Sequence, residues 1–234
     1  MLFYGYYLDP LYIMVAVITL SIMLVAQILV KSRYSKYSRI RNTHNITGAQ
    51  AAERILKANG IFDVRVEKVS GKLTDHFDPK AKVIRLSEGV YDSPSISAVG
   101  IAAHEAGHAV QHAEGYIPIK IRTAIVPFAQ YGPSIGIILM LIGVLLNFYN
   151  LTLLGVVLFG ATFIFQFVTL PVEFNASSRA LRTIRDNNLL LGDEIRGARK
   201  VLTAAALTYV AAMISSLLTL LYYATRFLGR SRRQ

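Results

Sequence analysis

Two histidines and a glutamate near the middle of the chain have the spacing of a metal site. They belong to the run HEAGH at residues 104–108. On a helix, His104 and His108 lie on one face, one turn apart, so both imidazoles can bind a single tetrahedral Zn²⁺. Glu105 then lies beside the metal, where its carboxylate can take a proton from zinc-bound water. The spacing therefore predicts hydrolytic zinc chemistry.

A catalytic zinc site needs a third protein ligand, and the chain has no cysteine to supply a thiolate. His112 continues the same spacing, but it lies about 12 Å along a straight helix from His104, so we do not expect both to bind one ion. Glu173 is the better candidate. Its alternative role is that of a carboxylate that stabilises a helix N-terminus. Residue spacing alone favours neither role.

The elements that must hold these residues include long uncharged segments. Only 17% of the 234 residues are charged and 53% are hydrophobic, whereas roughly 25% charged is usual for globular proteins. Segments without any charged residue are 11–30, 125–148, 151–170 and 201–223. Each is long enough to cross about 30 Å of hydrocarbon as a helix. The composition predicts a membrane protein with a water-exposed part, and it excludes disordered and disulfide-stapled classes.

The order of these spans explains how Glu173 can approach the histidines. Residues 147–150 between spans two and three are too few for anything but a hairpin, so the third span returns to the side of the HEAGH helix and ends just before Glu173. Small residues follow at helical spacing, namely Ala176, Ser177 and Ala180. They permit close approach of two helices.

The predicted fold class is a mainly α membrane protein with about four transmembrane helices and a small α+β domain between spans one and two. The expected segments are a transmembrane anchor at 1–30, a metal-binding domain at 31–124, a transmembrane hairpin at 125–170, a helix with the third ligand at 171–200, and a transmembrane helix with a basic tail at 201–234. Pro127 and Pro133 predict that the first third of span two is irregular or interfacial.

Lysine and arginine indicate the orientation. Of the 25, 15 lie between spans one and two and 6 between spans three and four, which are on the same side of a four-span chain. This side is expected to be cytoplasmic. The basic run at 31–41 is interpreted as a topology and anionic-lipid signal, not as a nucleic-acid site. The tail conflicts with this assignment, since four arginines would face outward: Arg226, Arg230, Arg232 and Arg233.

Local signals outline the soluble segment. Thr47 and Gln50 form a capping box for a short helix closed by Asn59-Gly60. Residues 63–70 and 82–86 are expected to be strands, and 74–79 a loop. Ser93-Pro94 is expected to begin a helix that continues to about residue 113.

Three stretches resemble the YugP-like zinc-dependent membrane metallopeptidases: HEAGHAVQH at 104–112, TLPVEFNA at 169–176 and AAALTYV at 204–210. The resemblance covers nearly the whole chain, including DHFDP at 75–79. It implies a bacterial cytoplasmic-membrane protein with a zincin-like domain and a gluzincin-type site, in which His104, His108 and Glu173 hold zinc and Glu105 is the general base.

The chain is also similar to HtpX-type and CAAX prenyl proteases, whose ligand glutamate opens an E-x-x-x-D pattern. Here the fourth position after Glu173 is Ser177, so the carboxylate that would orient a ligand histidine is absent from that slot. In zincins an edge strand before the zinc helix pairs with the substrate backbone, and residues 83–86 are the candidate.

The function expected from these features is that of a zinc metalloendopeptidase acting on membrane or membrane-proximal proteins. The alternative is a non-catalytic, zinc-stabilised membrane scaffold or chaperone-like protein. A metal transporter would carry ligands inside its spans, and these contain no His, Asp or Glu. An intramembrane protease is also disfavoured, because residues 94–113 carry Glu105 and three histidines.

Two further groups have simpler interpretations. Asp75, His76 and Asp78 offer ligands for a second metal, but a turn beside Pro79 explains them better. Tyr209 is a weak candidate for oxyanion stabilisation, because aromatic residues are common at membrane interfaces.

Overall fold

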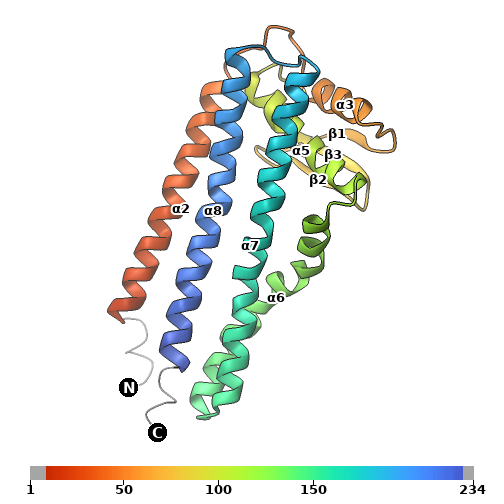
Figure 1. Ribbon diagram of the computed structural model, residues 1–234. Helices are drawn as coiled ribbons and strands as arrows, with labels where there is room; N and C mark the ends of the chain where they lie inside the picture. The colour runs from red at the N-terminus through yellow and green to blue at the C-terminus, as the bar shows by residue number, and fades with distance from the viewer. Residues whose placement is uncertain (1–8, 229–234) are drawn as a thin grey trace. The chain divides into compact units, whose positions relative to one another are not determined.

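The computed structural model describes residues 9–228. In chain order its elements are α2 (Pro10–Tyr37), α3 (Gly48–Ala58), β1 (Arg65–Val69), β2 (His76–Asp78), β3 (Val83–Ser87), α4 (Glu88–Tyr91), α5 (Ile96–Ala113), α6 (Ile117–Leu145), α7 (Tyr149–Asp186) and α8 (Asp193–Leu228). Long helices dominate, and the three strands all lie between α3 and α4 in the chain (Figure 1). This confirms the predicted mainly α fold with a small α+β part.

The chain divides into two compact units, each built from separate stretches of sequence. The first, here the helical unit, consists of Met1–Ala26, Lys120–Leu170 and Thr208–Gln234. The second, here the mixed unit, consists of Gln27–Ile119 and Pro171–Leu207. The helices α2, α6, α7 and α8 therefore contribute residues to both units.

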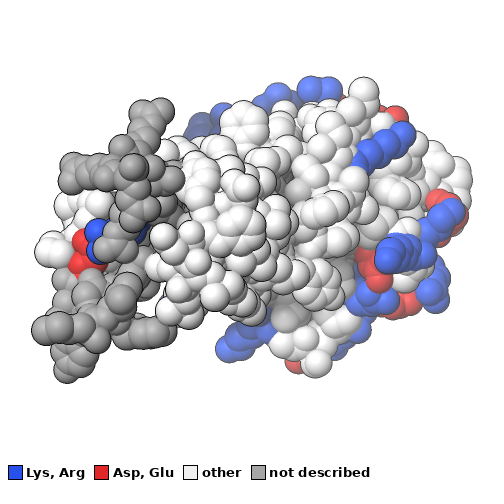
Figure 2. Space-filling model, turned by 90° about the horizontal axis from the view of Figure 1, so that it is seen from below, with Lys and Arg blue, Asp and Glu red and all other residues white. Residues whose placement is uncertain are grey.

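Four helices are long and apolar enough to cross a membrane, as predicted: α2, α6, α7 and residues Asp193–Arg226 of α8. Many large apolar side chains of α2 are exposed, including Leu20 at 70% and Val25 at 66%. Figure 2 likewise shows a broad face with few charged side chains. A surface of this kind is stable in contact with lipid.

Within the helical unit, α6 and α7 form the predicted antiparallel hairpin. A Cβ atom on Gly136 would lie 2.6 Å from the carbonyl oxygen of Gly155, and one on Gly155 would lie 2.6 Å from that of Gly136. The two backbones thus meet at a distance that only glycine allows. The predicted irregularity in span two is wrong, because α6 is helical throughout with Pro127 and Pro133 inside it. Transmembrane helices tolerate proline where neighbouring groups satisfy the freed carbonyls.

The N-terminal end of α2 meets the C-terminal end of α8 in the same unit. Asp9 Oδ2 lies 3.4 Å from Arg226 Nε and accepts a hydrogen bond of 3.2 Å from the Tyr222 hydroxyl. The N-terminal end of α2 and the C-terminal end of α8 therefore lie together. A chain that crosses a membrane an even number of times requires this arrangement. Arg226, one of the four tail arginines, has an acidic partner here. Arg230, Arg232 and Arg233 lie outside the described residues.

The mixed unit contains a three-stranded sheet in the order β1-β3-β2. β3 pairs in parallel with β1 and antiparallel with β2. The expectation that residues 83–86 form an edge strand is therefore wrong, because β3 is central. The predicted loop at 74–79 contains β2, whose three residues are too short for a clear alternating pattern. Arg85 of β3 contributes to holding this strand, since its Nη1 lies 2.9 Å from Asp78 Oδ2.

Capping interactions set the ends of two helices. The capping box of α3 is confirmed, with Thr47 and Gln50 hydrogen-bonded to each other's backbone amides. The start of α5 lies two residues later than predicted, at Ser95, whose hydroxyl accepts from the amide of Ala98. Pro94, predicted as the first helical residue, lies before the helix. Its carbonyl accepts hydrogen bonds from the backbone amide and the side chain of Asn42.

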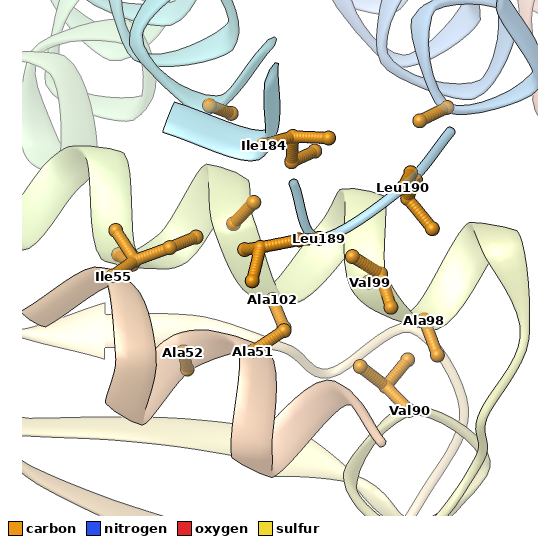
Figure 3. Packing of buried hydrophobic residues seen from close by; sticks show 14 of the residues in the cluster. Ala51, Ala52, Ile55, Val90, Ala98, Val99, Ala102, Ile184, Leu189 and Leu190 are labelled. Carbon is orange, nitrogen blue, oxygen red and sulfur yellow. The ribbon is translucent and has the colours of Figure 1, made fainter. Parts of the chain in front are cut away.

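The core of the mixed unit surrounds α5. Figure 3 shows small residues of α5, including Ala98, Val99 and Ala102, packed between α3 and the chain that links α7 to α8. Ala98, Val99 and Ala102 are fully buried. Because most of the α5 surface is covered, its position is fixed on several sides. Polar side chains on such a helix must have partners within the protein.

Candidate metal centre

The structure brings the two histidines of the HEAGH run together on one face of α5. The ring centres of His104 and His108 lie 4.7 Å apart, with the ring planes at 82°. His108 is buried, whereas His104 is partly buried. This is the arrangement expected for residues four apart on a helix.

Glu173 of α7 completes a group of three ligand atoms. Its Oε2 lies 3.2 Å from His104 Nε2 and 3.5 Å from His108 Nε2, and the ligand atoms of the three residues lie within 4.8 Å of one another. Glu173 is 1% exposed. Pro171 lies inside α7, so Glu173 is in the helix interior and not at a helix N-terminus. The role of a carboxylate that caps a helix start is thereby excluded.

These donors fit zinc. Two imidazole nitrogens and one carboxylate oxygen are a common ligand set of catalytic zinc sites, which keep a fourth position for water or substrate. Spacings below 5 Å allow three ligands to share an ion at bond lengths near 2.0–2.2 Å after small side-chain adjustments. A buried glutamate facing two imidazoles is also costly unless a cation or a proton balances its charge.

Glycine in the HEAGH run permits the approach of α7. A Cβ on Gly107 would lie 2.8 Å from the carbonyl oxygen of Ala176, which is shorter than a real contact allows. Ala176 and Ala180, predicted from their size to permit close helix packing, are both buried. Small residues on both helices therefore place Glu173 within reach of the histidines.

Each histidine contacts a neutral polar group through its other ring nitrogen. His104 Nδ1 lies 3.1 Å from the Ser177 hydroxyl, and His108 Nδ1 lies 3.0 Å from Gln111 Oε1. Ser177 thus occupies the slot in which the E-x-x-x-D pattern would place a carboxylate. Because the Nδ1 atoms contact Ser177 and Gln111, the Nε2 atom of each ring faces Glu173. This is the orientation that metal binding needs.

Glu105 is 7% exposed and lies close enough to affect His108 electrostatically. Burial alone lowers the pKa of His108, but the hydrogen bond with Glu173 and the charge of Glu105 outweigh it, so the pKa is raised. A metal ion binds the unprotonated imidazole, so metal binding at this position competes with a proton on His108.

The remaining sequence candidates lie elsewhere. His112 is exposed, with its ring 5.9 Å from that of Phe77, and it is not among the three grouped ligands. Asp78 accepts from the amides of Lys80 and Ala81, which is the predicted turn role. Tyr209 belongs to the helical unit, whereas the metal group belongs to the mixed unit.

Asp75 likewise has a structural role. It accepts hydrogen bonds from the backbone amide and hydroxyl of Ser87, at 2.8 and 3.0 Å. Burial raises the pKa of its carboxyl group, and the contacts with Ser87 only partly oppose this. These bonds join the end of β3 to the segment before β2, and Asp75 is not part of the metal group.

Two residues of the site are not distinguished by the sequence pattern. Gln111 is fully buried and donates from Nε2 to the Val172 carbonyl at 2.8 Å and to Asn175 Oδ1 at 2.9 Å. The available signal is position, since Gln111 lies three residues after His108 and Asn175 two after Glu173. An uncharged amide carries no recognisable chemistry by itself, so both residues resemble ordinary helix residues in the sequence.

The comparisons with known proteins agree with this site. Residues 12–228 match the family described as "Putative neutral zinc metallopeptidase". A Bacillus subtilis (strain 168) protein described as "Putative membrane protease YugP" is 47% identical over 219 residues, covering 94% of this chain and 97% of that protein. No solved structure matches the chain. The extent of both matches shows that this chain belongs to the family described as "Putative neutral zinc metallopeptidase", and the His–His–Glu group is the part of the chain that could hold the metal.

Proposed function

We propose that this protein is a membrane-embedded zinc endopeptidase that hydrolyses peptide bonds of membrane or membrane-proximal proteins. The convergence of His104, His108 and Glu173 around one point, with Glu105 next in sequence to the first ligand, carries the proposal. A zinc ion held there supplies a Lewis acid that polarises a peptide carbonyl and activates water.

The protein side chains have distinct roles in this proposal. His104, His108 and Glu173 hold the metal, and the two uncharged imidazoles with one carboxylate leave the site a net positive charge that favours a carbonyl oxygen. Glu105 acts as the general base that accepts the proton of the attacking water and passes it to the leaving amine. Its low exposure keeps bulk water from competing for that proton.

We propose β2 as the strand that binds substrate, in place of the central strand β3. One edge of β2 is occupied by β3, and among the described residues no strand pairs with the other. Phe77 of β2 contacts His112, one turn beyond His108 on α5. An extended peptide added to this edge would run near the metal group.

The proposed location is the cytoplasmic membrane of a bacterium, with the mixed unit on the cytoplasmic side. The surplus of lysine and arginine in the segments of this unit supports that side. The contact between Asp9 and Arg226 supports a common side for the two chain ends, and it pairs one of the tail arginines that conflicted with this orientation.

The second candidate is a scaffold in which zinc only stabilises the fold. The burial of Glu173 at the meeting point of α5 and α7 favours it, because a metal there would join two helices. A structural site has no need of Glu105, however. The glutamate therefore separates the two functions.

The deciding experiment compares wild type and Glu105→Gln by quantitative proteomics of membrane fractions. We expect Glu105→Gln to retain about one zinc per chain and to accumulate proteins or fragments that the wild type removes. The control is Glu53→Gln, an exposed glutamate on α3. Identical proteomes for wild type and a zinc-loaded Glu105→Gln protein would favour the scaffold.

A further inference from the structure

A chain of hydrogen bonds runs from the exposed Glu114 of the mixed unit, through partly buried side chains, to the metal group. Arg179 Nη2 lies 2.7 Å from Glu114 Oε2, and Arg179 Nε donates to Asn175 Oδ1 at 2.7 Å. The same Asn175 oxygen accepts from Gln111 Nε2, and Gln111 Oε1 faces His108 Nδ1 at 3.0 Å. All of these residues belong to α5, its C-terminal cap or α7.

The direction of each hydrogen bond in this chain is determined. A guanidinium only donates, so the Asn175 atom that faces Arg179 must be the oxygen. Gln111 presents its amide nitrogen to that oxygen and to the Val172 carbonyl, two groups that only accept there. The amide oxygen of Gln111 is therefore left to face His108, and His108 must donate from Nδ1.

We propose that Gln111 is a positioning residue of the metal centre, which selects the Nδ1–H tautomer of His108 and tethers the Glu173 turn of α7 to α5. This role rests on zinc binding by His108 and Glu173, but not on peptide hydrolysis. The tautomer leaves the lone pair of Nε2 directed toward Glu173, the side on which a shared metal ion would bind. The bond to Val172, the residue before Glu173, holds the third ligand at the same time.

The carboxamide is matched to this task. It is fully buried, and its two N–H groups and its oxygen each have one partner. A carboxylate would repel the two acceptor oxygens, and an apolar side chain would remove all three hydrogen bonds and leave His108 Nδ1 without this acceptor. Removal of a group that orients a metal ligand typically lowers metal affinity about 10–100-fold. We expect a loss of this size when Gln111 is replaced.

The test uses the full-length protein labelled with ¹⁵N-histidine, together with Gln111→Met and Gln111→Glu. Methionine keeps the length and removes every hydrogen bond, whereas glutamate keeps the acceptor for His108. In metal-free protein, at an alkaline pH where His108 is neutral, we expect His108 as the Nδ1–H tautomer in wild type and Gln111→Glu, and a mixture of tautomers in Gln111→Met. Zinc affinity, measured by chelator competition, should fall about 10–100-fold in both variants. Gln130→Met, at an exposed glutamine of α6, is the matched control.

Unchanged zinc affinity in Gln111→Glu would overturn the tether, and an Nε2–H tautomer of His108 in wild type would overturn the assignment of the ring. If Gln111→Met does not fold, the spectrum of the wild type and the zinc affinity of Gln111→Glu still test the proposal. None of these readouts depends on proteolysis. The role of Gln111 can therefore be tested even if the protein has no peptidase activity.

Discussion

At the scale of single residues, the metal group differs from an E-x-x-x-D site in the charge of its surroundings. The ring nitrogens that face away from Glu173 contact a hydroxyl and an amide, Ser177 and Gln111, instead of a carboxylate. A carboxylate partner raises the basicity of a ligand histidine. In the proposed peptidase, neutral partners would leave more of the charge of a bound zinc ion available for a peptide carbonyl, while they still orient the rings.

Ser177 provides a test of this orientation. We expect Ser177→Ala to lower zinc affinity about 10-fold, because His104 loses the contact that holds its ring, and Glu173→Ala to lose most of the zinc. Chelator competition on purified protein measures both. Ser178→Ala, at the exposed neighbouring serine, is the control. Full zinc retention in Glu173→Ala would refute the assignment of the third ligand.

At the scale of elements, the site depends on two helices that approach within backbone contact. α5 supplies two ligands and α7 supplies one, and Gly107 lies against Ala176 where they meet. The ligand turn of α7 follows directly from a segment long and apolar enough to span a membrane. One continuous helix therefore carries both a candidate membrane span and the proposed third metal ligand.

We expect Gly107→Ala to separate α5 from α7. The added Cβ would lie 2.8 Å from a backbone oxygen, which cannot rotate away, so the helices must move. Overpacking of this kind costs about 1–3 kcal/mol, and zinc affinity should fall with it. Thermal unfolding and zinc titration measure the two effects. Gly160→Ala is the control, because its Cβ would meet only Leu220 side-chain atoms at 3.5 Å. Equal behaviour of the two variants would contradict the role of Gly107.

The proposed substrate strand is also a property of elements. If a peptide adds to the free edge of β2, a peptide hydroxamate that binds zinc should slow hydrogen exchange of amides in residues 76–78. Amides of β1, at the opposite edge of the sheet, are the internal control. Mass-spectrometric exchange with and without the hydroxamate makes the comparison. Slower hydrogen exchange at β1 alone would contradict the proposal, because the peptide would then bind at the opposite edge of the sheet.

At the scale of the whole molecule, the contact between Asp9 and Arg226 agrees with an even number of membrane crossings. The pair lies in the helical unit, at the N-terminal end of α2 and the C-terminal end of α8. Because the ion pair joins the first and last spans, it stabilises the four-span arrangement as well as the position of each helix end.

The orientation can be tested because the native chain has no cysteine. We expect Asn150→Cys, at the α6–α7 turn, to react with a membrane-impermeant maleimide in intact cells. Ser70→Cys, an exposed residue of the mixed unit, should react only after permeabilisation. The cysteine-free parent shows the background. The reverse pattern would place the mixed unit outside the cell.

Residues close in sequence determine much of this protein by local geometry alone. Helical spacing is sufficient to group His104, Glu105 and His108, and uncharged length is sufficient to identify the four spans. The capping box of α3 is likewise readable from four residues. These features require no knowledge of what packs against them.

Only the tertiary structure decides which distant residues meet. Glu173 has two equally supported roles until α7 places it against both histidines, and the edge strands are β1 and β2 because β3 pairs on both sides. Gln111 acquires a role only through its contacts with His108 and Val172. Such pairings depend on side-chain packing between helices and on strand order, which sequence spacing within one element does not encode.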